Sequence, residues 1–432
     1  MRIGDLLALD PFRPLETVVK ITDHDPRKVW SEMNEYVATE TLKRYFREVL
    51  DTFLETRRGA TERVCIWVSG FFGSGKSHFV KVLGYLLENR DLEDQDGHRH
   101  PSTEFLCRKL GLESFLPLLS RELRIKVVYI NLLDHDPQSP RRPTFSRLIY
   151  QKLLEDSGLS SEFWTAAWEK ELRALGKWEE FRTWVRQTYG RAWEDERRLH
   201  AEAVLKRALP LLFPDRYATE DEAARALQES KRATSEISPS EVVAELRRVA
   251  EGIDPQAGRL VLLLDEAGLY IGESMNRLTD LNALAEQVVQ QAGGKVILIA
   301  TAQEALTDLV PRLTRERHIL EWLRDRFRLR LGLEPTEVQA VVAARLLAKK
   351  AAGDEQLRAL YRTHQGALLS ALNLDGSLAE GSFVVQYPCP PYAIRLMQDI
   401  MGGLRGSVEE AHRLSGSERS MLKLVHAILT GE

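Results

Sequence analysis

The chain has 432 residues, of which 44% are hydrophobic and 29% are charged, a composition typical of a soluble globular protein with two or three domains. A formal net charge of −4 excludes an overall attraction to nucleic acid or to an acidic membrane. The cysteines Cys65, Cys107 and Cys389 are too widely separated for a disulfide framework or a metal cluster, which favours a reducing compartment. No apolar stretch approaches the length of a membrane span, and the N-terminus lacks a signal-peptide core. We therefore expect a cytoplasmic protein without membrane contact.

Residues 1–58 are predicted to form an N-terminal helical extension that packs on the domain that follows. Its clearest helix has an apolar face with three- and four-residue spacing, made of Leu42, Tyr45, Phe46, Val49, Leu50 and Phe53. After this extension we expect an α/β core at 59–335, which is interrupted by a helical insertion at 145–256. A helical lid subdomain is expected at 336–432.

Residues 70–77, GFFGSGKS, match the phosphate-binding P-loop pattern GxxxxGK[ST]. The motif follows an apolar run at 64–69, which predicts a strand, and precedes an apolar helical pattern at 79–87. Backbone N–H groups and the helix N-terminus would surround the phosphates of a nucleoside triphosphate. Lys76 would contact the β- and γ-phosphates, and the Ser77 hydroxyl would bind Mg²⁺. An ordinary glycine-rich turn is the alternative. We predict nucleotide contacts from Gly70, Gly73, Ser74, Gly75, Lys76, Ser77 and His78.

The predicted insertion is highly charged and contains five of the eight tryptophans, Trp164, Trp168, Trp178, Trp184 and Trp193. Tryptophans at this spacing are expected to pack a small core of the insertion itself. A surface that stacks nucleic-acid bases is the alternative. The last helix of the insertion is predicted to begin with a capping box at Ser238, Pro239 and Glu241 and to end just before Gly252.

Continuous apolar runs at 126–131, 259–265 and 295–300 predict buried strands of a parallel sheet covered on both faces. The second run ends in Asp265-Glu266, the acidic strand end that completes Mg²⁺ coordination in P-loop enzymes. Asp265 would hold the ion, and Glu266 would polarise the attacking water. The alternative is that Glu266 faces solvent.

The third of these strands is followed by Thr301, with Gln303 two residues further on. A polar residue at this point lies between the acidic strand end and the γ-phosphate in related enzymes, so we predict this role for Thr301 first and Gln303 second. The alternative is that the Thr301 hydroxyl caps a helix.

Residues 312–330 contain seven arginines. The segment LRDRF at 323–327 resembles the arginine-finger segment of AAA+ ATPases, in which an arginine before a phenylalanine reaches the active site of a neighbouring subunit. We assign this role to Arg326, with Arg324 as the second choice. A solvated basic face, or a patch that touches phosphate backbone, is the alternative. The next helix is predicted to begin with Thr336 as its N-cap, and Arg395 is a candidate nucleotide contact from the lid.

Several segments resemble the large P-loop ATPase of the BREX and phage-growth-limitation defence systems, the BrxC/PglY family. The most specific segment is VSGFFGSGKSHFVKVLGYLL at 68–87. Others are LDEAG at 264–268, ATAQEAL at 300–306, DRFRLRL at 325–331, RLLAKK at 345–350, QYPCPPYAIRLMQDI at 386–400 and SGSERSML at 415–422. Members of the family are longer, so we expect this chain to be an N-terminal portion or a natural short form.

The resemblance implies an ATPase that uses Mg²⁺ and works with a DNA methyltransferase and an alkaline-phosphatase-like protein against phage DNA replication. An AAA+-like arrangement implies homo-oligomers, because a finger in trans needs a neighbour. The alternative is an ATP-controlled scaffold with little turnover of its own. A DNA-binding module with an incidental P-loop would need a continuous basic surface. A small-molecule phosphotransferase is disfavoured by Glu266 beside Asp265.

Overall fold

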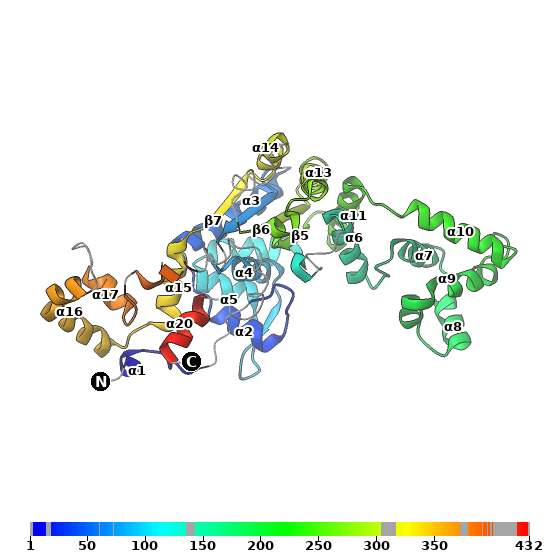
Figure 1. Ribbon diagram of the computed structural model, residues 1–432. Coiled ribbons are helices and arrows are strands. Elements are labelled where there is room, and N and C mark those ends of the chain that lie inside the picture. The colour runs from blue at the N-terminus through cyan, green and yellow to red at the C-terminus, as the bar shows by residue number, and fades with distance from the viewer. Residues whose placement is uncertain are drawn as a thin grey trace.

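The computed structural model describes residues 3–13, 19–59, 61–71, 73–134, 143–303, 317–371, 379–390, 392–394, 396–397, 400 and 421–430. Its centre is a five-stranded parallel sheet with the strand order β4-β5-β6-β1-β7 (Figure 1). The strands are β1 (Cys65–Gly70), β4 (Arg124–Asn131), β5 (Gly258–Asp265), β6 (Val296–Ala302) and β7 (Leu329–Leu333). A separate two-stranded hairpin is formed by β2 (Asp91–Glu93) and β3 (Arg99–Pro101).

Strands β5 and β6 are buried at every residue, as expected for apolar strands that are covered on both faces. The chain crosses from β1 to β4 in one direction and returns through β5 and β6 to β7 in the other. Right-handed crossovers therefore place the intervening helices on opposite faces of the sheet. One set is α4 (Lys76–Glu88) with α5 (Ser102–Leu110), and the other is α11 (Pro239–Ile253), α13 (Met275–Gln291) and α14 (Arg317–Arg326). Together with the strand–loop–helix unit at the P-loop, this sheet confirms the predicted α/β P-loop NTPase fold.

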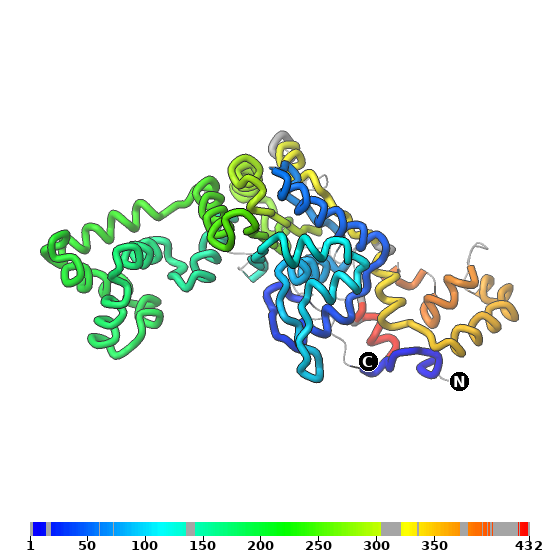
Figure 2. The backbone as a smooth tube through the Cα atoms, turned by 180° about the vertical axis from the view of Figure 1, so that it is seen from behind, coloured from blue at the N-terminus to red at the C-terminus, as the bar shows by residue number. Residues whose placement is uncertain are grey.

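The N-terminal segment contains α1 (Ile3–Leu6), α2 (Pro26–Asn34) and α3 (Glu40–Arg58). The apolar face predicted for α3 enters the main core, where Phe46, Val49, Leu50 and Phe53 are completely buried. Helix α1 instead packs against α16 (Ala351–Ala371), where Leu6 joins Leu357 in a small cluster. Figure 2 shows the same neighbourhood from behind. The first part of the chain therefore contacts both the sheet and the C-terminal helices.

The predicted insertion forms an arm that projects from the central sheet (Figure 1). Its first and last helices, α6 (Phe145–Asp156) and α11, contribute side chains to the core of the sheet. The arm itself is α7 (Phe163–Ala174), α8 (Trp178–Tyr189), α9 (Trp193–Leu212) and α10 (Glu220–Ala233). Trp168 and Trp193 are buried in a separate core of the arm, and Trp164, Trp178 and Trp184 pack against it. This packing favours the interpretation that the tryptophans stabilise the arm.

Two predicted helix boundaries are wrong. The capping box of α11 is present as predicted, but the helix continues through Gly252 to Ile253, because the backbone there stays helical until Asp254. Helix α15 (Pro335–Leu346) begins two residues earlier than predicted, with Pro335 in its first turn and Glu334 at the N-cap instead of Thr336. Proline is well suited to that first turn because it has no N–H to satisfy.

The remaining elements are short or lie near the C-terminus. The C-terminal helices are α15, α16, α17 (Glu380–Gln386) and α20 (Met421–Thr430). Short helical turns occur at Glu113–Phe115, Leu118–Glu122, Leu132–Asp134 and in α12 (Ala267–Ile271). Within the described ranges, none of the helices combines the length and the apolar character needed to cross a lipid bilayer.

A buried polar network provides a test of the arm. The Glu169 carboxylate accepts hydrogen bonds from Trp193 Nε1 at 2.5 Å, Arg197 Nη1 at 2.8 Å and the Ser160 amide at 2.7 Å. Glu169→Ala removes the acceptor of the Trp193 indole and the Ser160 amide and the counter-charge of Arg197, so we expect the free energy of unfolding of the arm to fall by about 3–5 kcal/mol. Urea denaturation followed by tryptophan fluorescence measures this change.

The matched control is Glu179→Ala, because Glu179 is 78% exposed and its carboxylate pairs with Arg182 on the surface. We expect that substitution to change the free energy of unfolding by less than about 0.5 kcal/mol. Equal effects of the two substitutions would contradict the role given to the buried network.

Candidate nucleotide-binding site

The P-loop joins the carboxyl end of β1 to the N-terminus of α4, as predicted. Gly73 has φ 77° and Gly75 has φ 90°, which is backbone that side chains with a Cβ rarely adopt. Gly70 is constrained by space instead, because an added Cβ would lie 2.6 Å from Ser74 Oγ and 3.0 Å from Leu333 Cβ. Glycine is therefore required at Gly73 and Gly75 by the backbone conformation and at Gly70 by the lack of space. These requirements favour a specifically shaped phosphate-binding loop over an ordinary turn.

Polar side chains are buried inside this loop. Lys76 is 4% exposed, and its Nζ donates to the carbonyl oxygens of Gly70 at 3.0 Å and Phe71 at 3.3 Å. Ser74 is 7% exposed, and its Oγ has no hydrogen-bond partner among the residues that the structure describes. Ser77 lies half-buried in the first turn of α4. A buried hydroxyl, an ammonium group and a helix N-terminus at one point are suited to the oxygens of a phosphate chain.

The structure places His78 differently from the rest of the motif. Its Nε2 lies 2.9 Å from the Glu32 carbonyl oxygen, and its ring packs edge-on against Tyr36 with centroids 4.7 Å apart. Burial lowers the pKa of His78 to about 4, so the ring is neutral at pH 7 and Nε2 carries the proton that is donated. The imidazole thus contacts the N-terminal segment, which leaves only its backbone amide for the predicted nucleotide contact.

The acidic end of β5 is tied to β6 by one hydroxyl. Thr301 Oγ1 donates to Asp265 Oδ1 at 2.6 Å and accepts from the Glu266 amide at 2.9 Å. All three residues are buried, with exposed fractions of 1%, 5% and 8% in the same order. Strand β6 pairs directly with β1 on its other side, so this network lies at the same edge of the sheet as the P-loop. The Thr301 hydroxyl of β6 thus connects the Asp265 carboxylate at the end of β5 with the Glu266 amide at the start of α12.

Glu266 has an unusual backbone. Its φ of 61° and ψ of 36° are left-handed, and it occupies the N-cap of α12. A left-handed residue other than glycine costs of the order of 1–3 kcal/mol and often marks a functional site. Gly268 follows, where an added Cβ would lie 2.8 Å from Ala302 Cβ. The close packing of Gly268 in α12 against Ala302 of β6 therefore restricts where the chain turns from β5 into α12 at Glu266.

Asn131 is a further polar residue at this edge that sequence reasoning missed. It ends β4 and is paired in register with Asp265. Its Nδ2 donates to Asp134 Oδ1 at 2.8 Å, and its Oδ1 accepts from the Leu133 amide at 3.2 Å. A polar residue after the apolar run 127–130 was the available signal.

Arg326 lies near the amino-terminal ends of the strands, whereas the P-loop lies at their carboxyl ends. It precedes β7 by three residues, and β7 runs parallel to β1 with Leu329 opposite Ile66 and Leu333 opposite Gly70. The four-residue step along β7 from Leu329 to Leu333 is about 13 Å long, and Arg326 lies before the start of this step. Its Nη2 is 3.3 Å from Glu286 Oε1, and the side chain is 33% exposed. Arg326 therefore does not contact the P-loop of its own chain.

The other predicted residues have mixed positions. Arg324 is exposed in the last turn of α14. Gln303 immediately follows β6 and is half-buried. Arg395 lies outside the described residues. A second group of possible metal ligands, Asp94, Asp96 and His98, lies on the β2–β3 hairpin, where Asp94 already accepts hydrogen bonds from the hairpin backbone and from His100.

No protein-family model matches the chain. Among solved structures, the chain is similar to a Walker-type ATPase of Pyrococcus abyssi, with 12% sequence identity and a TM-score of 0.33. The match covers 92% of this chain and 80% of that chain. A TM-score this low carries no argument about function, so the fold assignment rests on the strand order and on the P-loop geometry described above.

Gly70 offers a direct test of the loop geometry. Gly70→Ala forces a Cβ against Ser74 and Leu333, so we expect a loss of about 1–3 kcal/mol in the free energy of unfolding from overpacking. Gly366→Ala in α16 is the control, because nothing lies within 4 Å of its added Cβ. We expect it to stabilise by about 0.5–1 kcal/mol. Thermal unfolding of both variants checks the expectation, and a neutral Gly70→Ala would contradict it.

Proposed function

We propose that this chain is a Mg²⁺-dependent ATP hydrolase. The observation that carries the proposal is the hydrogen-bonded group of Asp265, Thr301 and Glu266, which meets the P-loop at one edge of the sheet. A phosphate-binding loop alone would fit any nucleotide-binding protein. The buried carboxylates of Asp265 and Glu266, separated from the P-loop strand by β6, add an ion ligand and a base, which a hydrolase requires.

Each residue has a distinct role in this proposal. Lys76 exchanges the loop carbonyls of Gly70 and Phe71 for β- and γ-phosphate oxygens, and the loop amides bind the remaining oxygens. Ser77 and Asp265 are the residues that would hold Mg²⁺, which neutralises the charge that develops on the phosphates. Glu266 accepts a proton from the attacking water. Thr301 orients both acidic residues through its two hydrogen bonds.

We further propose that Arg326 acts in trans, within a homo-oligomer. Arg326 lies at the end of the strands opposite the P-loop, and this position would suit a residue that contacts the nucleotide of a neighbouring subunit. An arginine that reaches the γ-phosphate in this way contributes about 10³–10⁵ in rate. Its partial exposure leaves part of the guanidinium accessible to such a neighbour.

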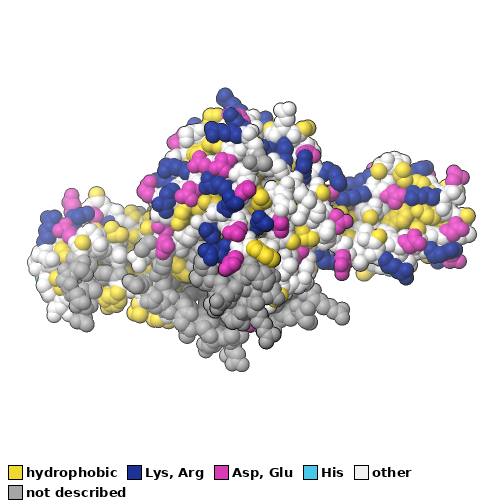
Figure 3. All heavy atoms as spheres, turned by 90° about the horizontal axis from the view of Figure 1, so that it is seen from above, with side chains coloured by type: hydrophobic (Ala, Val, Ile, Leu, Met, Phe, Trp, Pro, Cys, Tyr) yellow, Lys and Arg dark blue, Asp and Glu magenta, His cyan; other side chains and the backbone are white. Residues whose placement is uncertain are grey.

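The biological role that we propose follows from the resemblance to the BrxC/PglY family. In this role the ATP cycle drives or gates a DNA-targeted defence complex in the cytoplasm, with a methyltransferase and a phosphatase-like protein as partners. Contact with DNA would be through the complex. On the face shown in Figure 3, Lys and Arg side chains are interspersed with Asp and Glu over the body and the arm, which disfavours a continuous basic surface on that face.

A nucleotide-controlled scaffold is the second candidate. The pairing of Arg326 with Glu286 and its distance from the P-loop of the same chain favour it, since an isolated subunit lacks this arginine at its own phosphate site. Such a chain would bind ATP, change conformation and recruit partners with little turnover alone.

Glu266→Gln tests the hydrolase. The amide cannot accept the proton of the attacking water, so we expect Mg-ATP binding to be kept within about threefold and turnover to fall by about 10²–10⁴. Lys76→Ala is the companion variant and should lose nucleotide binding itself. Phosphate release and calorimetric titration with Mg-ATP measure the two quantities. Hydrolysis that persists in Glu266→Gln would remove the general-base role.

Arg326→Ala tests the arrangement in trans. We expect the specific activity of the unmodified chain to rise with protein concentration, and the variant to lose about 10³–10⁵ of the rate at concentrations where oligomers form. Arg324→Ala, at an exposed residue two positions earlier in α14, is the control and should keep most of the activity. A wild-type rate that does not depend on protein concentration would count against a shared site.

A further inference from the structure

Helix α2 is fixed to the P-loop helix through buried charges. Lys81 of α4 and Glu32 of α2 form an ion pair with Nζ–Oε2 2.5 Å, and their side chains are 0% and 4% exposed. The Glu32 backbone oxygen also accepts from His78, two residues after the P-loop lysine. Such a buried pair cannot be separated without exposing an uncompensated charge to the protein interior. A displacement of the first turns of α4 therefore has to move α2 with it.

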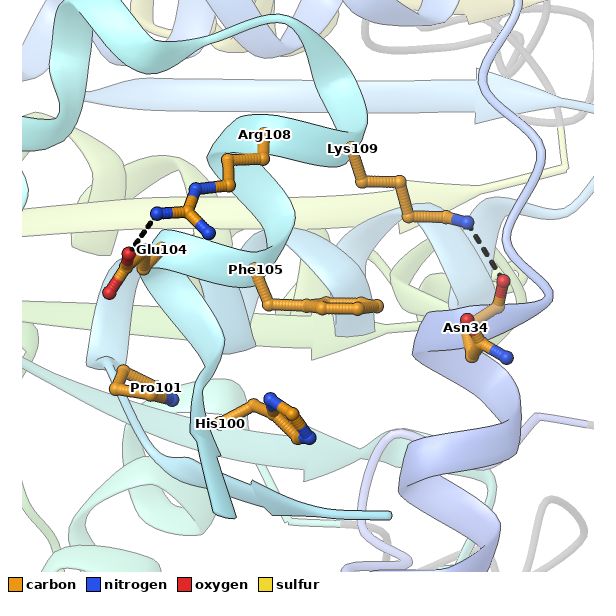
Figure 4. A pocket seen from close by; sticks show the side chains of 7 residues that line it. All are labelled: Asn34, His100, Pro101, Glu104, Phe105, Arg108 and Lys109. Carbon is orange, nitrogen blue, oxygen red and sulfur yellow. Dashed lines mark hydrogen bonds and ion pairs between the residues drawn. The ribbon is translucent and has the colours of Figure 1, made fainter. Parts of the chain in front are cut away.

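Helix α5 holds the other side of α2. Lys109 Nζ donates to the Asn34 carbonyl oxygen at 2.8 Å, across a cavity of about 480 Å³ between the two helices. Figure 4 shows this bond, with Phe105 and His100 below it. Trp30 of α2 packs against both of these rings, with centroids 5.2 Å and 5.1 Å away. Helix α2 is thus attached to two helices on the same face of the sheet.

The end of α2 contacts the C-terminal helices. Glu35 directly follows α2, and its carboxylate lies between two guanidinium groups, with Arg13 Nη1 at 3.1 Å and Arg345 of α15 in close contact. Arg345 is 7% exposed in its side chain. Thr39, which caps α3, donates a second short hydrogen bond to Glu337 of α15. Two polar links therefore join this turn to α15.

We propose that residues 26–39, the coupling segment, are positioning residues that join the P-loop helix to the C-terminal helices, so that nucleotide in the P-loop and the arrangement of α15 influence each other. The inference rests on the nucleotide binding proposed above. Coupling of this kind is reciprocal, because each site changes the equilibrium that the other depends on. Phe71 of the P-loop also packs against the α15 cluster, and the coupling segment adds a polar connection that can be cut without altering the loop.

The test is hydrogen–deuterium exchange with the nonhydrolysable analogue AMPPNP and Mg²⁺, on the full chain and on the double variant Glu35→Ala/Glu337→Ala. In the unmodified chain we expect the analogue to slow exchange at least fivefold in α4 and in α15. The double variant should keep the protection of α4 and lose that of α15 to less than twofold. Glu48→Ala is the matched control, because Glu48 forms an exposed ion pair with Arg44 on α3, outside the coupling segment, and it should behave as the unmodified chain.

The outcomes separate the two proposals. Protection of α15 that survives in the double variant overturns the coupling segment, and so does a chain in which α4 is protected but α15 is not. A lack of protection in α4 itself shows that the nucleotide does not bind, which overturns the proposed function and this inference with it. Should the double variant fail to fold by circular dichroism, Glu35→Gln/Glu337→Gln, which keeps the shape of both side chains and removes both charges, gives the same comparison.

Discussion

The hydroxyl of Thr301 connects the parts of the candidate site. It bonds to Asp265 at the end of β5 and to the amide of Glu266 at the start of α12, and it belongs to the strand that pairs with β1. Because β6 lies between β5 and β1, the distance from the acidic residues to the P-loop is set by two successive strand spacings. Neighbouring strands are about 4.8 Å apart, so β5 and β1 are about 10 Å apart, and the pairing of the strands fixes this spacing. The roles proposed for Lys76 and Glu266 both depend on this spacing.

The arm and the C-terminal helices are attached to this centre in different ways. The arm has an apolar core of its own, and α6 and α11 join it to the core of the sheet. The C-terminal helices contact the P-loop through Phe71 and the N-terminal segment through Glu35 and Leu6. The N-terminal segment therefore spans two bodies, and the chain uses residues far apart in sequence to connect them.

Local patterns predicted the elements that depend on local chemistry. The apolar run of β5, the amphipathic face of α3 and the capping box of α11 were all recognisable, because each depends on neighbours within a few residues. The P-loop was recognisable for the same reason. The end of α11 and the N-cap of α15 were each missed by two residues, since glycine and threonine only bias such boundaries.

The features that were not predicted depend on contacts between distant segments. The pair of Lys81 with Glu32 joins residues 49 positions apart, and the Glu35–Arg345 contact joins residues 310 positions apart. His78 belongs to the P-loop motif by sequence, and only the fold shows that its ring contacts α2. The strand order, which places Arg326 opposite the P-loop, likewise follows from the pairing of β7 with β1 and not from any local pattern.

The backbone of Glu266 has a consequence for the balance between stability and activity. Glycine or asparagine would adopt its left-handed conformation at lower cost, so a chain shaped by folding alone would have one of these residues at that position. A longer carboxylate side chain is present instead, at the point where the strand ends beside Asp265. Substitutions that relax this residue would thus make the protein more robust and leave it without its proposed base, a trade-off common at active sites. Screens for thermal stability would select against the proposed activity at this residue.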